Sequence, residues 1–82
     1  MEQNNKRLIF TVICNEEKYL NQVIEWYNTS YKTDFRIIRI INDEVGFAEI
    51  EVTKYKESDL FDLGYQFGVK EQRLRQEGKI DW

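Results

Sequence analysis

The sequence predicts a small α+β domain in which an antiparallel sheet carries two helices on one face. Segments rich in β-branched and aromatic residues alternate with amphipathic segments of helical period, in the order strand, helix, strand, strand, helix. The 82 residues contain no proline, no Gly/Ser-rich linker and no internal repeat. We therefore expect one domain over residues 1–82, with the polar N-terminus 1–6 and the tail 79–82 as candidates for less ordered ends.

The first strand is predicted over residues 8–14, an apolar run that ends before Asn15. Asn15 is a favourable N-cap, and Glu16 and Glu17 favour the first turn of a helix. This helix is predicted to continue to about residue 31. Its apolar side chains recur at the spacing of a single face, which should pack on the sheet: Leu20, Val23, Ile24, Tyr27 and Tyr31.

Residues 35–54 are predicted to form a β-hairpin around the turn formers of residues 42–46. A two-residue loop would point Arg39 into the helix-covered face, where an unpaired charge is costly. A loop of five or three residues instead pairs Ile40 with Ala48 and Ile38 with Ile50 on the covered face. It also pairs Ile41 with Phe47 and Arg39 with Glu49 on the other face, so we favour this register.

The second helix is predicted to begin at Ser58 and to stop near Gly78. Leu60, Leu63, Phe67 and Leu74 share one face of it. Gly64 and Gly68 each cost the helix about 1 kcal/mol relative to alanine. We expect this cost to reflect close packing of the helix against the sheet or the first helix.

The order of these elements is that of the ferredoxin-like split βαβ plait, with a possible short C-terminal strand in the tail. Two helices can cover only one face of the sheet, so the other face should be open. The predicted register assigns the following residues to this open face: Ile9, Thr11, Ile13, Phe35, Ile37, Arg39, Ile41, Phe47, Glu49 and Glu51.

An apolar surface of this kind indicates an interaction site. Two copies stacked by their open faces would bury Ile41 and Phe47 about a twofold axis, with Arg39 and Glu49 setting the register. Alternatively, helix two or the Trp82 tail crosses this face and completes the core of a monomer.

The residue types argue against an enzyme. The chain has no histidine, the commonest general base and neutral metal ligand. Cys14 lies before a helix N-terminus, where its thiol pKa could fall, but a buried structural cysteine is the better interpretation. The acidic pairs lack the spacing of a calcium loop and fit solvated helix ends. We expect no catalytic residue, no metal and no cofactor.

Residues 46–52, Gly-Phe-Ala-Glu-Ile-Glu-Val, resemble in part the RNP1 segment of the RNA-recognition motif. This resemblance implies single-stranded RNA binding as an alternative function. The segment departs from the motif because Val45 replaces a basic residue, and Glu49 and Val52 replace aromatic ones. Two glutamates on a base-stacking face would also repel phosphate.

The net charge of −3 argues against nucleic acid or an anionic membrane as the main partner. The first apolar run is too short for a spanning helix or a signal peptide. One cysteine cannot form an internal disulfide, so we expect a cytosolic protein.

These observations predict a non-enzymatic protein-binding module, either a homodimer or a regulator or inhibitor that docks a larger protein. A small-ligand regulatory domain is a further alternative. The predicted partner-binding residues are Ile37, Arg39, Ile41, Phe47 and Glu49 on the open face, with Trp26 and Trp82 as secondary aromatic contacts.

Overall fold

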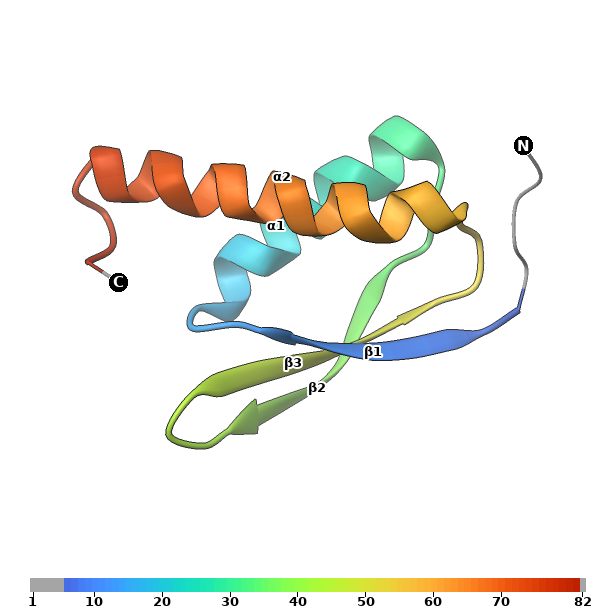
Figure 1. Cartoon of the computed structure of the whole chain (residues 1–82), viewed down its shortest axis with the longest axis horizontal. Helices are drawn as coiled ribbons and strands as arrows, with labels where there is room; N and C mark the ends of the chain where they lie inside the picture. The colour runs from blue at the N-terminus through green and yellow to red at the C-terminus, as the bar shows by residue number, and fades with distance from the viewer. Residues whose placement is uncertain (1–5, 82) are drawn as a thin grey trace.

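The computed structural model describes residues 6–81 and contains five helices and strands. In chain order they are β1 (Leu8–Ile13), α1 (Glu17–Tyr31), β2 (Arg36–Asn42), β3 (Gly46–Val52) and α2 (Glu57–Gln76). The three strands are antiparallel in the order β1-β3-β2, so β3 is central. Both helices lie on one face of the sheet (Figure 1), which confirms the predicted α+β arrangement.

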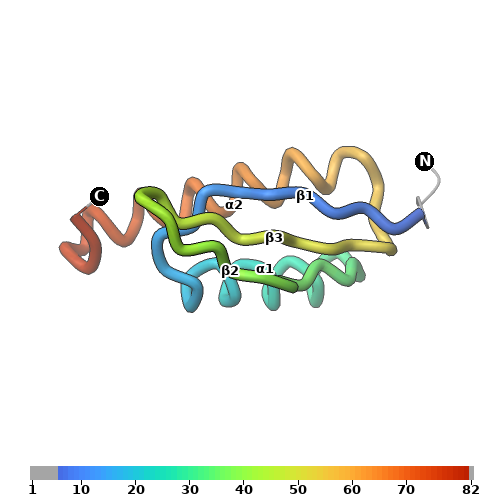
Figure 2. The backbone as a smooth tube through the Cα atoms, turned by 90° about the horizontal axis from the view of Figure 1, so that it is seen from below, coloured from blue at the N-terminus to red at the C-terminus, as the bar shows by residue number. Residues whose placement is uncertain are grey.

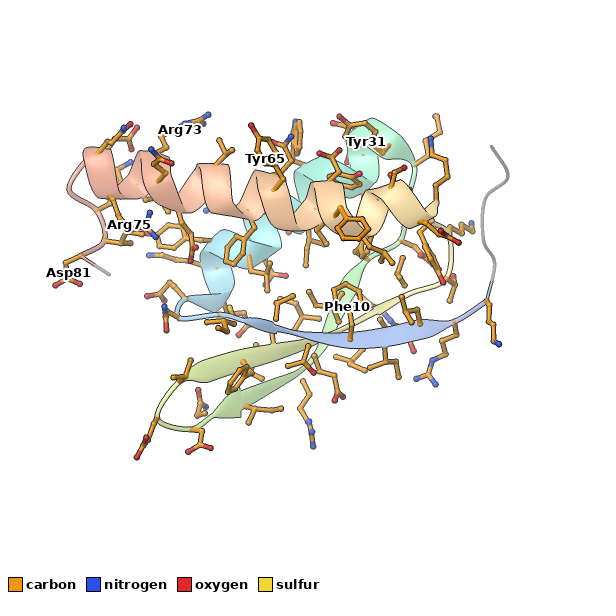
Figure 3. All side chains as sticks on the ribbon, in the orientation of Figure 1. Phe10, Tyr31, Tyr65, Arg73, Arg75 and Asp81 are labelled. Carbon is orange, nitrogen blue, oxygen red and sulfur yellow. The ribbon has the colours of Figure 1, made fainter. Side chains whose placement is uncertain are left out.

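The core lies between this sheet face and the helices. Four of the five residues predicted for the buried face of α1 are buried: Leu20, Val23, Ile24 and Tyr27. Ala48, Ile50 and Val52 of β3 face them, together with Leu63 of α2. Phe10 points from β1 toward the helices (Figure 3) and makes an edge contact with Phe35. Tyr31, the fifth predicted residue, is nearly half exposed because it lies in the last turn of α1.

The helix starts differ slightly from those predicted. The N-cap of α1 is Glu16 rather than Asn15, because the Cys14 N–H still donates to Gly46 O (2.8 Å) and keeps the chain extended. The helix α2 begins one residue before Ser58, and the Asp59 carboxylate accepts the Lys56 N–H (2.8 Å), as in half of a capping box.

The end of α2 is the predicted one. Gly78 has a φ of 75°, a left-handed conformation that glycine adopts without strain. Its N–H donates to Arg75 O, and the Lys79 N–H donates to Leu74 O. These two bonds are the Schellman pattern that satisfies carbonyls at a helix C-terminus.

The hairpin has a three-residue loop, because Asn42 pairs with Gly46. Ile40 opposite Ala48, Ile41 opposite Phe47 and Arg39 opposite Glu49 are all as predicted.

A β-bulge at Ile38 makes the predicted register wrong on the N-terminal side of Arg39. Ile37, not Ile38, lies opposite Ile50, and Arg36 lies opposite Glu51. One inserted residue exchanges the faces of all residues before it, so the assignment of Phe35 and Ile37 to the open face is wrong. Phe35 is instead only 2% exposed, in contact with the Tyr27 ring. The bulge allows Phe35 to enter the core while Arg36 stays in water.

The close packing expected at Gly64 and Gly68 is also wrong. A Cβ built at either position would meet no atom within 4 Å, so both glycines face open space on α2.

No fourth strand occurs in residues 6–81, so the predicted C-terminal strand is not observed there. Ile80 is nevertheless buried, which fixes part of the tail. The remaining predictions for residues 1–5 and Trp82 lie outside the described residues. Neither α1 nor α2 has an apolar stretch long enough to cross a membrane.

Candidate partner-binding face

The sheet face opposite the helices is uncovered in the described chain (Figure 2). The alternative in which helix two crosses this face is wrong, because α2 lies with α1 on the other side. The strand registers arrange the side chains of this open face in three rows across the sheet. In order from the hairpin, the rows are Ile13–Phe47–Ile41, Thr11–Glu49–Arg39 and Ile9–Glu51–Arg36.

The row nearest the hairpin is entirely apolar. Ile13 is 61% exposed, and Phe47 and Ile41 are partly exposed beside it. Phe47 comes from the central strand, with one isoleucine on each side. Three neighbouring apolar side chains that no described residue covers make a contiguous patch, which is the kind of surface that marks interaction sites.

The middle row adds a loosely held ion pair. The Arg39 Nη2 lies 3.6 Å from Glu49 Oε2, and the arginine side chain remains 63% exposed. An exposed pair at this distance contributes little to stability. Arg39 therefore keeps most of its donors available to a carboxylate of another molecule.

The charged groups of the third row are already paired with one another or with Arg7. Glu51 forms salt bridges with Arg7 and Arg36, with Arg36 Nε at 2.7 Å from Glu51 Oε1. Hydrogen bonds from Arg7 and then Arg36 lower the pKa of the Glu51 carboxyl. Because Glu51 is buried beneath these arginines, this row has no unpaired carboxylate to offer a partner.

Two polar side chains fix the loop that leads into β2. Asn28 of α1 binds both backbone groups of Phe35, donating to its O (2.8 Å) and accepting from its N–H (2.9 Å). Asp34 accepts the N–H groups of Thr53 and Lys54 at 2.8 and 2.7 Å. Burial alone would raise the pKa of Asp34, but the hydrogen bond from the Thr53 hydroxyl and these two backbone bonds outweigh it and lower the pKa. The loop is thereby held against both α1 and the end of β3.

Four of the predicted contact residues lie together on the open face: Arg39, Ile41, Phe47 and Glu49. Ile37 does not, because the bulge turns it toward the core. Trp26 is exposed but belongs to α1 in the helix layer, so it cannot act with the open face. Trp82 lies outside the described residues.

Sequence reasoning missed Arg7 and Arg36. The signal for Arg36 was its spacing from Arg39. Residues three apart lie on opposite faces of a regular strand, so one of these two charges had to point into the core unless a bulge intervened.

The helix layer contains a second concave feature, a groove of about 340 Å³ between α1 and α2. Trp26 and Val23 line one wall, and Val69, Lys70 and Arg73 line the other. In the described chain neither Lys70 nor Arg73 forms a salt bridge, so the groove is electropositive in an acidic protein.

The described residues contain no group of three or more His, Cys, Asp or Glu side chains placed to hold a metal ion. Burial raises the pKa of the Cys14 thiol, which disfavours the reactive thiolate.

No protein-family model, curated protein or solved structure gave a significant match to this chain.

Proposed function

We propose that this chain is a non-enzymatic protein-binding module that docks another protein on its open sheet face. The observation that carries the proposal is the exposed apolar row Ile13–Phe47–Ile41 beside the loosely paired Arg39. An apolar centre with a flanking arginine is the composition that dominates protein interfaces. The partner would cover the row with apolar side chains and offer a carboxylate to Arg39.

The charge of the middle row favours a different protein as the partner on this face. If two copies stacked face to face with the twofold axis over β3, Glu49 of one copy would lie near Glu49 of the other. A like-charge contact removed from water is costly. A regulator or inhibitor that docks a larger protein avoids this cost.

We also propose the ferredoxin-like plait as the architecture. The element order βαββα, the central position of β3 and the two helices on one face support it. A cytosolic location remains a prediction from the cysteine count.

The change Phe47→Lys tests the assignment of the face. It places a charge in the centre of the apolar row and should weaken partner binding at least about 30-fold, the effect of losing a hot-spot residue. Phe47 is partly exposed, so the fold should survive. Partner capture is compared between wild type and variant after circular dichroism has shown that both are folded.

The matched control is Trp26→Lys, which changes an exposed aromatic residue in the helix layer. A partner that binds wild type and Trp26→Lys equally but loses Phe47→Lys supports the proposal. A partner retained in full by Phe47→Lys shows that the binding surface lies elsewhere.

The groove between the helices supports a second candidate, a regulatory domain for a small anionic ligand. Its volume of about 340 Å³ is within the range of ligand pockets, and Lys70 and Arg73 would bind the anion. Anionic metabolites that raise the melting temperature of wild type but not of Arg73→Glu would support this candidate.

RNA binding has weaker support. Phe47 is the single aromatic residue in the three rows, whereas single-stranded RNA stacks successive bases on several rings. Retardation of an RNA single strand with strong salt dependence would favour it over protein binding.

A further inference from the structure

The groove between α1 and α2 lies in the helix layer, away from the open sheet face. Arg73, which lines it, extends from α2 on the side away from the sheet (Figure 3). The helix α1 contributes Gln22 and Trp26 to the groove, and α2 contributes Gln66 and Lys70 as well as Arg73. A ligand bound here would leave the open face free, so the two surfaces can be tested separately.

The charges along the groove are separated by sign. The two helices run in roughly opposite directions (Figure 1), and the Tyr27 hydroxyl of α1 donates to Asp59 and Asp62 near the start of α2. Carboxylates therefore lie at that end. Lys70 and Arg73 lie farther along α2, one turn apart. A negatively charged group is attracted only to this second end of the groove.

Carboxylates close in the sequence do not neutralise these two cations. Glu71 is two residues from Arg73, a rotation of about 200° around the helix, so it lies on the other side of α2. Glu77 forms a salt bridge with Lys79 at 3.3 Å. No salt bridge within residues 6–81 involves Lys70 or Arg73. Both cations can therefore bind an anion from outside the chain.

Two cations one turn apart suit a phosphate better than a carboxylate. The two oxygens of a carboxylate are satisfied by the parallel N–H groups of one arginine. A phosphate monoester carries a charge of about −1.5 to −2 at neutral pH and has three strong acceptor oxygens, so it can bind Lys70 and Arg73 at once. The pair therefore favours a phosphate monoester as the anionic group.

Trp26 forms an aromatic wall on the opposite helix. Its ring makes edge contacts with the rings of Tyr27 (centroids 6.2 Å apart, interplanar angle 75°) and Tyr31 (6.1 Å, 84°), so its orientation is fixed before a ligand binds. It is nevertheless 49% exposed. A fixed, half-exposed indole is a platform on which a planar base can stack, and little side-chain entropy is lost on binding.

Two side-chain amides line the groove, one from each helix. Gln22 is one turn before Trp26, and Gln66 is one turn before Lys70, so each is a neighbour of that residue on its own helix. A carboxamide both donates and accepts hydrogen bonds. Gln66 Nε2 makes only a long contact with Asp62 Oδ1, at 3.5 Å, which it can exchange for one with a ligand. The amides can therefore bind the hydroxyl groups of a sugar or the edge of a base.

We infer that the groove binds a purine nucleoside monophosphate, with the base stacked on Trp26 and the phosphate bound by Lys70 and Arg73. This inference rests on the second candidate function, a site for a small anionic ligand, and specifies that ligand. The groove volume of about 340 Å³ is in the range of small-molecule sites. A two-ring purine covers the indole more fully than a one-ring pyrimidine does, so purines should be preferred.

The experiment titrates the full chain with AMP and GMP by isothermal titration calorimetry. The nucleotide that binds more tightly is then compared with its own nucleoside, with ribose 5-phosphate and with inorganic phosphate. Each of these fragments lacks the base, the phosphate or the sugar and base together. We expect each fragment to bind at least about tenfold more weakly than the nucleotide, because it loses either the stacked ring or the charged hydrogen bonds.

Two variants test the assigned contacts. Arg73→Gln and Trp26→Leu should each weaken nucleotide binding about tenfold or more, through loss of a charged hydrogen bond and of the stack respectively. Circular dichroism establishes that each variant is folded, and Arg73→Gln decides alone if Trp26→Leu does not fold. The matched control is Arg75→Gln, which makes the same change of charge outside the residues that line the groove. It should bind the nucleotide as tightly as wild type.

Failure of wild type to bind either AMP or GMP overturns the inference, as does a folded Arg73→Gln or Trp26→Leu that binds as tightly as wild type. A fragment that binds as tightly as the nucleotide also overturns it. If that fragment is ribose 5-phosphate or inorganic phosphate, the second candidate function stands as a general anion site, so the two failures are distinguished. Phe47→Lys should bind the nucleotide as wild type does, which separates this test from that of the open face.

Discussion

Tyr27 shows how one side chain can connect the two helices of this fold. Its hydroxyl donates to Asp59 Oδ1 (2.8 Å) and Asp62 Oδ2 (3.1 Å), and its ring stacks on Tyr31. Asp59 in turn accepts the Lys56 N–H at the start of α2. Burial and the two carboxylates raise the pKa of the Tyr27 phenol. The residue therefore stabilises the packing of α1 on α2 only while its hydroxyl is protonated.

The change Tyr27→Phe should cost about 1.5–3 kcal/mol of stability at neutral pH, since it removes hydrogen bonds to charged groups. The folded-state pKa lies above the unfolded value of about 10. This stabilisation is therefore fully present below pH 10 and lost as the pH rises above it. Urea unfolding of both proteins at pH 7 and pH 10.5 checks the prediction, and an equal difference at both pH values would contradict it.

At the scale of the elements, the two helix C-termini make a matched comparison. Both helices end with a left-handed residue, which is Lys32 (φ 58°) after α1 and Gly78 (φ 75°) after α2. A residue with a Cβ is strained in this conformation by about 1–2 kcal/mol, whereas glycine is not.

Lys32→Gly should therefore stabilise the protein by about 0.5–1 kcal/mol, and Gly78→Ala should destabilise it by a similar amount. The space around Gly78 is open, so a loss there reports backbone strain and not a clash. Thermal unfolding of the two variants measures both effects. The prediction fails if the two substitutions shift stability in the same direction.

The elements themselves were largely predictable, because their signals are local. The periodic apolar residues of α1, the turn formers before Gly46 and the left-handed stop at Gly78 each identify an element from a few neighbouring residues. The bulge at Ile38 was not predictable in this way. A bulge forms only if the free energy gained by burying Phe35 exceeds the cost of interrupting the hydrogen bonds between β2 and β3. That gain depends on contacts of Phe35 with Tyr27 and Phe10, which come from distant parts of the chain.

At the scale of the whole molecule, one layer of helices covers one face of the sheet, and β3 lies between β1 and β2. Ala48, Ile50 and Val52 of β3 are the most buried residues of the sheet. The outer N–H groups of β1 instead face solvent in a monomer.

Hydrogen exchange should follow this arrangement. The amides of β3 should exchange slowest, because they open only when the whole domain unfolds. The amides of Ile9, Thr11 and Ile13 should exchange faster, because Cys14 N–H donates to Gly46 O and the alternate residues of β1 therefore direct their N–H groups away from β3. Exchange of these three amides as slow as that of the β3 amides would contradict the prediction.

The sequence by itself determined the secondary structure, the buried helix faces and the pairing of Arg39 with Glu49, because hydrophobic period and turn chemistry act over a few residues. Only the tertiary structure decided the rest. It moved Phe35 and Ile37 into the core, placed Trp26 away from the open face, and showed that Gly64 and Gly68 face open space. These outcomes depend on which distant surfaces meet, and a local pattern cannot encode a choice that is made by packing across the whole domain.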